Sequence, residues 1–204
     1  MTTAAGVEKI ILGIDPGTNV MGYGLLRVNN RKPELMVMGV LQLKKLESHY
    51  VRLKRIYERV LGLIEQYHPD ELAIESPFVG INPNSMIKLC RAQGVAMAAA
   101  VERDIPIFEY SPAKVKIQMV GNGAASKEQV AAMVKNALHL TDEDMDAKFD
   151  ASDAVAIALT HFYISNKPQS MLSGGAKSKI PTHSGGGSAS WSAFVAQNAD
   201  RVHK

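Results

Sequence analysis

The ten residues KIILGIDPGT, at positions 9–18, decide the fold of this chain. From Ile10 to Ile14 the run is apolar without alternation, the pattern of a strand buried on both faces of a sheet. Asp15 ends the run, and Pro16 stops the strand directly after it. In open α/β sheets, ligands bind at the carboxyl ends of the strands. The stretch therefore predicts an α/β sheet with a functional carboxylate at the end of a central strand.

The segments that follow predict a mixed sheet flanked by helices. Two further strand patterns lie close behind the first and are joined by tight turns, which predicts an antiparallel meander. Strand and helix patterns then alternate, which is typical of the α/β class. The predicted strands are 9–14, 20–28, 34–43, 71–74 and 105–110, and the predicted helices are 48–66, 84–103, a short one from 111, one from 126, and 150–164. The prediction is a mixed five-stranded sheet with helices on its faces.

Length and composition predict one domain and a tail. The 204 residues, 46% hydrophobic and 21% charged, suit one globular domain and are too few for two α/β domains. We expect a domain at 1–165 and a disordered tail at 166–204, because the Gly, Ser and Pro of the tail cannot bury enough surface to fold. Trp191 and Phe194 are either a short partner-binding motif of this tail or part of a dispensable end.

Charge and cysteine usage narrow the class of protein. The net charge is +3, but 166–204 alone carries +4, which leaves −1 for 1–165. Bulk charge therefore does not point to nucleic acid, and only local clusters of basic residues could. Cys90 is the single cysteine, so an internal disulfide is excluded. No apolar run is long enough for a membrane span or arranged as a secretory signal, so we expect a cytoplasmic protein with no membrane association.

Four acidic residues are expected to form one site. Asp15 and Glu75 each end a buried strand, and they lie side by side if the two strands are neighbours. Asp150 and Asp153 are three residues apart on the last helix, so they share a face. That face continues as an apolar stripe, which directs Asp153 towards the sheet. Asp150 is either a member of the site or the N-cap of its helix.

Converging carboxylates of this kind predict a metal site. They repel one another and raise their pKa values unless cations neutralise them. Oxygen ligands in small number suit Mg²⁺ or Mn²⁺. Two such ions about 4 Å apart can activate water and stabilise the leaving oxygen of a phosphodiester. The absence of a Cys/His cluster does not favour zinc, and His161, on the apolar stripe, is interpreted as a hydrogen-bonded core histidine.

The acidic residues belong to a longer series of motifs. These are GIDPGT at 13–18, GYG at 22–24, AIE at 73–75, LCRAQGV at 89–95, FEY at 108–110, VGNG at 120–123 and DASDA at 150–154. In this order they resemble the RuvC family, the bacterial Holliday-junction resolvases of the ribonuclease-H-like nuclease superfamily. The resemblance runs from Lys9 to Tyr163, nearly the whole predicted domain. It implies a ribonuclease-H-like fold.

The resemblance also implies an activity and its partners. Asp15, Glu75, Asp150 and Asp153 would be catalytic and would ligate Mg²⁺, with Mn²⁺ as a substitute and two ions per subunit. Metal-activated water would nick two strands of a four-way DNA junction symmetrically and leave 5′-phosphate and 3′-hydroxyl ends. Members of this family act in recombination and repair as homodimers, with the RuvA–RuvB branch-migration complex. The small residues at 94–100 serve either such a dimer contact or close packing on the protein's own sheet.

Basic and aromatic residues complete the predicted DNA-binding set. Phe78 matches an aromatic that stacks on bases opened at the junction, and its alternative is core packing. Lys116 and Lys127 match basic residues near the scissile phosphate. Residues that would extend the phosphate-contacting surface are Lys88, Arg91, Lys114 and Lys135.

Three rival functions stay open at this point. IDPGT at 14–18 also resembles the phosphate loop of actin-like or sugar-kinase ATPases, but these need a second, duplicated domain that the sequence lacks. A ribonuclease-H-like nuclease acting on structured RNA would share the early Asp and the Glu. A non-catalytic junction-binding protein would not need all four acids.

Overall fold

The computed structural model describes residues 8–77, 82–143 and 149–166. The chain divides into a compact unit, Met1–Lys167, and a second unit, Pro168–Lys204. The predicted tail, with Trp191 and Phe194, lies outside the described residues. Among the helices described, none has both the length and the apolar character that crossing a bilayer requires.

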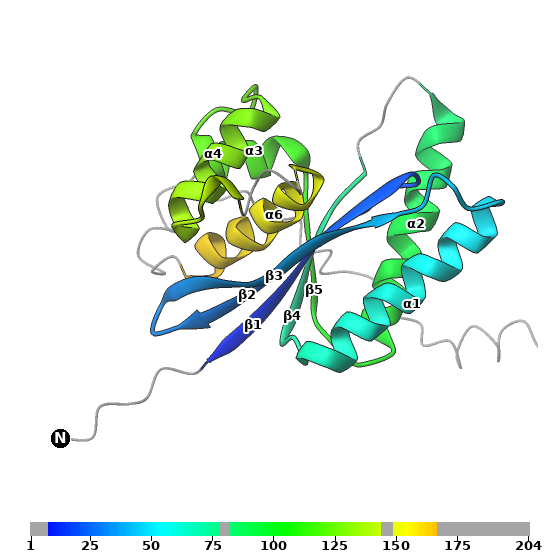
Figure 1. The fold of residues 1–204 in the computed structure, drawn as a ribbon, viewed down its shortest axis with the longest axis horizontal. Helices are drawn as coiled ribbons and strands as arrows, with labels where there is room; N and C mark the ends of the chain where they lie inside the picture. Colours follow the sequence, from blue (N-terminus) through cyan, green and yellow to red (C-terminus); the bar gives the residue numbers. More distant parts are fainter. Residues whose placement is uncertain (1–7, 78–81, 144–148, 167–204) are drawn as a thin grey trace, which may run out of the picture. The chain divides into compact units, whose positions relative to one another are not determined.

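Five strands form one mixed sheet in the order β3-β2-β1-β4-β5 (Figure 1). The first three, β1 (Lys9–Asp15), β2 (Val20–Asn29) and β3 (Lys32–Gln42), pair antiparallel as a meander. β4 (Glu71–Glu75) and β5 (Ile107–Tyr110) continue the sheet, β4 parallel to β1 and β5 parallel to β4. The central strand β1 is buried from Ile11 to Ile14. The predicted mixed five-stranded sheet is confirmed.

The turn between β2 and β3 is tighter than predicted. The sequence prediction placed a turn at 29–33 and began the third strand at Glu34, whereas β3 begins at Lys32. Asn30 and Arg31 form a two-residue loop, and both have positive φ, 49° and 63°. Two consecutive left-handed residues are what a type I′ hairpin turn requires, and this turn matches the twist of the flanking strands. Because neither loop residue is glycine, this turn type could not be recognised from the residues alone.

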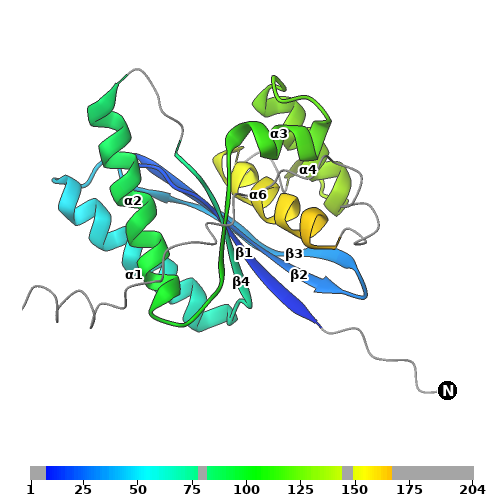
Figure 2. The same cartoon turned by 180° about the vertical axis from the view of Figure 1, so that it is seen from behind.

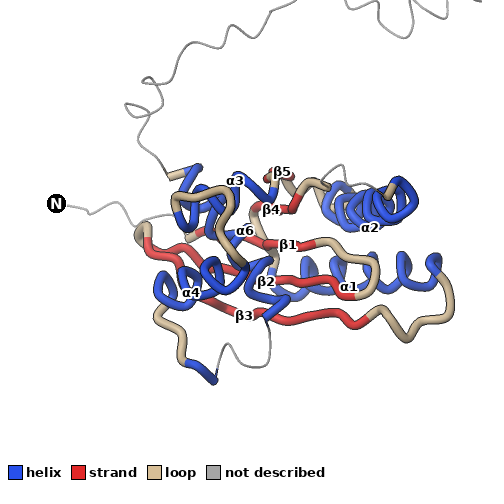
Figure 3. The backbone as a smooth tube through the Cα atoms, turned by 90° about the horizontal axis from the view of Figure 1, so that it is seen from above, coloured by secondary structure: helices blue, strands red, loops and turns tan. Residues whose placement is uncertain are grey.

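Helices cover both faces of the sheet. α1 (His49–Tyr67) and α2 (Pro83–Val101) lie on one face, and α3 (Pro112–Val120), α4 (Lys127–Leu138) and α6 (Phe149–Ser165) lie on the other (Figures 1 and 2). The view from above shows the sheet between these two layers (Figure 3). Each layer has its own apolar core, one closed by α1 and α2 and the other by α3, α4 and α6.

Side-chain caps set where several of these helices begin. Ser48, Ser111 and Ser126 precede α1, α3 and α4, and each hydroxyl accepts a hydrogen bond from a backbone N–H in the first turn. At α4 the bond is reciprocated, because the Gln129 side chain accepts from the Ser126 N–H. These caps satisfy N–H groups that have no partner within the helix. The predicted starts at 48, 111 and 126 are confirmed.

The contact between α6 and the sheet passes through a pair of glycines. Gly13 of β1 and Gly24 of β2 are register partners in the centre of the sheet. A Cβ at Gly13 would lie 2.2 Å from the backbone oxygen of Ala154, and a Cβ at Gly24 would lie 2.5 Å from Cγ2 of Val155. The helix backbone therefore lies directly on the strands at this glycine pair. This contact fixes how far above the sheet the N-terminal half of α6 lies.

We expect Gly13→Ala to lower the free energy of unfolding by about 2 kcal/mol or more, because the added methyl must push α6 away from β1. The matched control is Gly62→Ala in the middle of α1, where a Cβ meets nothing within 4 Å. There the same substitution should raise the free energy of unfolding by roughly 0.5–1 kcal/mol. Urea unfolding of both variants measures the difference. Equal changes in the two would contradict the close approach of α6.

Candidate active site

A hollow at the carboxyl ends of β1 and β4 gathers acidic and basic side chains from five elements, β1, β4, α3, α4 and α6. Its volume is about 270 Å³, and its lining consists of Asp15, Glu75, Pro112, Lys116, Lys127, Val130 and Asp153. Three larger hollows, of about 280, 410 and 570 Å³, bring together no comparable set of carboxylates. We refer to the 270 Å³ space as the acidic hollow.

The two strand-end acids are neighbours, as the sequence predicts. β1 and β4 pair in parallel with Ile14 opposite Ile74, so Asp15 and Glu75 occupy the next position of each strand. Each strand ends at its acid. The parallel pairing places both carboxylates at the same edge of the sheet.

Asp153 reaches the same hollow from α6. Its side chain is 17% exposed, and its Oδ2 lies 2.6 Å from Nζ of Lys127, the first residue of α4. Lys116 lines the hollow from α3. The structure thus brings together three of the four predicted carboxylates and the two lysines matched to the phosphate.

The electrostatics of the hollow favour a bound cation. The pKa of Glu75 is raised from its ordinary value of 4.5 to about 7, first by burial and then by the negative charges of Asp15 and Asp153. Lys127 and Lys116 act in the opposite direction but do not outweigh these effects. An added positive charge would favour the ionised carboxylate.

The donor set fits a hard divalent ion such as Mg²⁺. Three carboxylates from two strands and one helix offer only oxygen ligands, as Mg²⁺ and Mn²⁺ prefer. Within the described residues, no three His, Cys, Asp or Glu side chains converge closely enough to hold an ion as they stand. Asp15, Glu75 and Asp153 therefore border the acidic hollow without closing on one point.

The fourth predicted acid is only partly described. α6 begins at Phe149, so the backbone of Asp150 lies within its first turn and does not occupy the position before the helix. This does not favour the alternative in which Asp150 is the N-cap. Its side chain lies outside the part of the chain that the structure describes, as does the whole of Phe78.

The remaining predicted DNA contacts do not line the acidic hollow. Lys88 and Arg91 are exposed on α2, and Lys114 is exposed on α3 with its ammonium over the Tyr110 ring, 5.4 Å from the centroid. Lys135 forms an ion pair with Asp142.

Gln93 is a buried polar residue to which the sequence analysis assigned no role. It is 6% exposed on α2, and its Nε2 donates to the backbone oxygen of Glu75 at 3.3 Å and to Oε2 of Glu109 at 2.8 Å. These bonds hold the end of β4 where Glu75 projects. The available signal was an amide between the small residues Ala92 and Gly94 on a core-facing helix.

Comparison with known proteins connects this geometry to one family. The family model described as "Crossover junction endodeoxyribonuclease RuvC" matches residues 11–161. Curated proteins of that name from Bacteroides fragilis and Porphyromonas gingivalis are 52% and 51% identical to this chain over 195 residues. The match covers 96% of this chain in both cases, and 96% and 97% of the respective relative.

Solved structures of similar proteins share the fold. Thermus thermophilus RuvC in complex with Holliday junction substrate is 34% identical, with a TM-score of 0.68, and the match covers 76% of this chain and 94% of that chain. The yeast mitochondrial Holliday junction resolvase Ydc2 is 16% identical, with a TM-score of 0.57 and coverage of 74% and 77%, which shows the fold alone. The predicted ribonuclease-H-like fold is confirmed.

Because the pKa of Glu75 is raised, we expect the difference in free energy of unfolding between wild type and Glu75→Gln to depend on pH. Below about pH 4.5 the carboxyl is protonated in both the folded and unfolded states, so its burial carries no charge penalty. As pH rises to about 7 the unfolded state ionises first, so the folded wild type loses stability relative to Glu75→Gln. At about 1.4 kcal/mol per pKa unit, the full loss above pH 7 is on the order of 3 kcal/mol.

Urea unfolding at pH 4.5, 6 and 8 in the presence of a chelator measures this loss. Glu34→Gln, which removes an exposed carboxylate on β3, is the matched control and should differ from wild type by a nearly constant amount. If the difference in free energy of unfolding between wild type and Glu75→Gln is constant with pH, then burial and the neighbouring acids do not disfavour the ionised form of Glu75.

Proposed function

The chain belongs to the RuvC family of crossover junction endodeoxyribonucleases, and from this premise we propose that it resolves four-way DNA junctions at the acidic hollow. One observation carries the assignment of the site. Asp15, Glu75 and Asp153 border a single hollow beside two lysines, and the pKa of Glu75 is raised to about 7 by burial and by the other two acids. Such a set needs cations, as metal-dependent nucleases of this family do.

Each acid has a proposed role. Asp15, Glu75 and Asp153, with Asp150 added on the family resemblance, would hold Mg²⁺ or Mn²⁺, two ions per subunit. When bound, these ions would supply an activated water and stabilise the leaving oxygen. Attack on phosphorus breaks the bond to the 3′ oxygen and leaves a 5′-phosphate and a 3′-hydroxyl. The carboxylates, held at two strand ends and on one helix, would orient this in-line displacement through the metal ions.

The two lysines would act on the phosphate itself. Lys116 and Lys127 bring positive charge to the wall of the hollow from α3 and α4. Without substrate, Lys127 is held by Asp153 at 2.6 Å, so this pair keeps the ammonium next to the site. Its redirection to a phosphate oxygen would free the Asp153 carboxylate for metal binding. The lysines therefore link DNA binding to completion of the metal site.

Other DNA contacts are proposed on the resemblance. Phe78 would stack on a base opened at the junction centre, and Lys88, Arg91 and Lys114 would follow the phosphate backbone. The RuvA–RuvB branch-migration complex is the proposed partner. With DNA recombination and repair as its task, the protein would act in the cytoplasm.

We further propose that the protein acts as a homodimer through α2, because a junction resolvase must cut two strands. Four exposed residues of α2, Ile87, Gly94, Ala98 and Val101, fall at helical spacing on one side. The intervening alanines Ala92, Ala96 and Ala99 are fully buried in the core with α1. Some residues of the segment 94–100 thus pack on the protein's own core, whereas Gly94 and Ala98 face outward, on the side proposed for the dimer contact.

The family match and the acids of the hollow distinguish the proposed function from its three rivals. The match of residues 11–161 to a nuclease model overturns the ATPase reading. A catalytic site with three described acids disfavours a protein that only binds junctions. The same family match disfavours a nuclease whose substrate is structured RNA, because the family model and the curated relatives are those of crossover junction endodeoxyribonucleases.

We expect the protein to nick a synthetic four-way junction in Mg²⁺, and Asp15→Asn, Glu75→Gln and Asp153→Asn each to lower the rate at least about 100-fold. Junction binding in Ca²⁺ should persist, because the substitutions leave the DNA-contacting surface in place. Glu34→Gln is the matched carboxylate-to-amide control and should cut at the wild-type rate. Undiminished nicking by Asp15→Asn, or cleavage of structured RNA in preference to junctions, would contradict the proposal.

The dimer is tested in the same assay with a plasmid that extrudes a cruciform. Wild type should make paired incisions and linearise the plasmid. Ala98→Glu places a charge on the outward face of α2, so it should sediment as a monomer and leave single nicks. Paired incision by a monomeric Ala98→Glu variant would rule out α2 as the dimer contact.

A further inference from the structure

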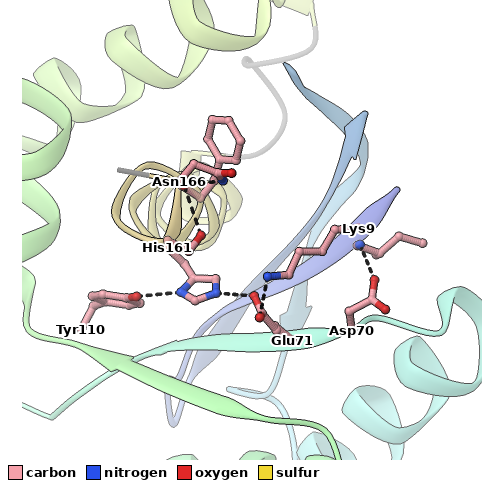
Figure 4. A network of polar contacts seen from close by, with 9 residues as sticks. Lys9, Asp70, Glu71, Tyr110, His161 and Asn166 are labelled. Atoms are coloured by element: carbon pink, nitrogen blue, oxygen red, sulfur yellow. Dashed lines mark hydrogen bonds and ion pairs between the residues drawn. The ribbon is translucent and has the colours of Figure 1, made fainter. Parts of the chain in front are cut away.

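A buried chain of polar side chains joins the C-terminal half of α6 to the sheet (Figure 4). His161 of α6 is 2% exposed, and both ring nitrogens are engaged. Its Nδ1 lies 2.7 Å from the Tyr110 hydroxyl on β5, and its Nε2 lies 2.5 Å from Oε2 of Glu71 on β4. The other Glu71 oxygen pairs with Nζ of Lys9 on β1 at 2.5 Å. We call Tyr110, His161, Glu71 and Lys9 the His161 chain.

The charge of Glu71 defines one hydrogen bond of this chain. Burial acts to raise the pKa of Glu71, but hydrogen bonds from Lys9 and His161 outweigh it and lower the pKa, so the group is a carboxylate. A carboxylate only accepts, so Nε2–H of His161 donates to it. Nδ1 faces the Tyr110 hydroxyl, a group that can donate or accept. Because both ring nitrogens have a partner, the orientation of the His161 ring is fixed.

A contact with an aromatic ring also restrains the His161 ring. The Phe108 ring lies 4.3 Å from the His161 ring, centroid to centroid, at an interplanar angle of 31°. Contacts with β5, through Phe108 and Tyr110, and with β4, through Glu71, therefore define the place of His161. The sequence interpretation of His161 as a hydrogen-bonded core histidine is confirmed, but its partners have a further consequence.

The His161 chain and the acidic hollow lie at opposite ends of one pair of elements. On α6, Asp153, Ile157 and His161 form a ridge of residues four apart. On β4, Glu71, Ala73 and Glu75 alternate onto one face, and Ala73 packs in the α6-side core. His161 meets Glu71 at one end, while Asp153 and Glu75 border the same hollow at the other.

The two spacings match. Eight residues of helix from Asp153 to His161 rise about 12 Å, and four residues of strand from Glu71 to Glu75 extend about 13 Å. A shift of α6 along β4 that broke the contact of His161 with Glu71 would therefore move Asp153 away from Glu75. Ala154 and Ala158 face Gly13 and set how closely α6 approaches β1. They form no directional bond that would resist such a shift.

We propose that His161 is a positioning residue for the metal centre, because its bonds to Glu71 and Tyr110 set the axial register of α6 and hence the separation of Asp153 from Glu75. This inference rests on the proposed function of the acidic hollow. His161 touches neither metal nor DNA in this role. Its loss should weaken metal binding through Asp153, beyond any loss of stability.

The test measures Mn²⁺ binding to the DNA-free protein by electron paramagnetic resonance, followed by junction cleavage kinetics. His161→Leu removes both bonds and should weaken Mn²⁺ binding about tenfold, the range for groups that orient metal ligands. The Mg²⁺ midpoint for cleavage should rise by a similar factor with the KM for junction DNA unchanged. His161→Gln keeps an amide that can donate to Glu71, so it should recover part of the Mn²⁺ affinity.

The control separates positioning from stability. Val60→Ala on α1 opens a cavity in the core on the opposite face of the sheet, so it should lower stability while leaving Mn²⁺ affinity within twofold of wild type. Tyr110→Phe removes a single hydroxyl from the chain and should weaken Mn²⁺ binding about threefold. If His161→Leu does not fold, the Mn²⁺ affinity of Tyr110→Phe decides whether the His161 chain positions the metal centre.

The outcomes distinguish this inference from the proposed function. Wild-type Mn²⁺ affinity in a folded His161→Leu or, failing that, in Tyr110→Phe would overturn the positioning role and leave the acidic hollow intact, provided that Asp15→Asn weakens binding. Wild-type Mn²⁺ affinity in Asp15→Asn as well would overturn the metal site and, with it, the inference.

Discussion

The contact of α6 with the glycine pair Gly13–Gly24 sets how the helix lies on the sheet, and the geometry of the acidic hollow follows from it. Because neither glycine has a side chain, the backbone at Ala154 and Val155 lies directly on β1 and β2. Asp153 precedes this contact by one residue, so its depth above the sheet is set there. The strand ends place Asp15 and Glu75, and the helix contact brings the third carboxylate to the same hollow.

This packing concentrates negative charge where the fold itself gains nothing from it. Glu75 is buried and faces two other acids, and the lysines only partly compensate, so its pKa rises to about 7. A core optimised for stability would not keep such a group. The strain is local, because the layers around it are ordinary apolar cores with capped helices. Metal ions bound together with the substrate would relieve this repulsion between the carboxylates.

Much of the site could be predicted because its signals are local. A charge that ends an apolar strand marks Asp15 and Glu75, and the i, i+3 spacing marks Asp153. The His161 chain could not be predicted, because His161 is 90 residues from Glu71 and 51 from Tyr110. A single sequence carries no signal for such long-range pairs. The hairpin at Asn30 and Arg31 was misplaced for a different reason, since positive φ there falls on residues other than glycine.

We propose that Asp15, Glu75 and Asp153 hold divalent metal ions at the place where DNA is cut. Anomalous diffraction from crystals of the protein with Mn²⁺ and a four-way junction would locate these ions. Mn²⁺ peaks are expected within bonding distance of these three carboxylates and next to a junction phosphate. Mn²⁺ bound only elsewhere, with junction DNA seated and the three carboxylates without metal, would contradict this proposal.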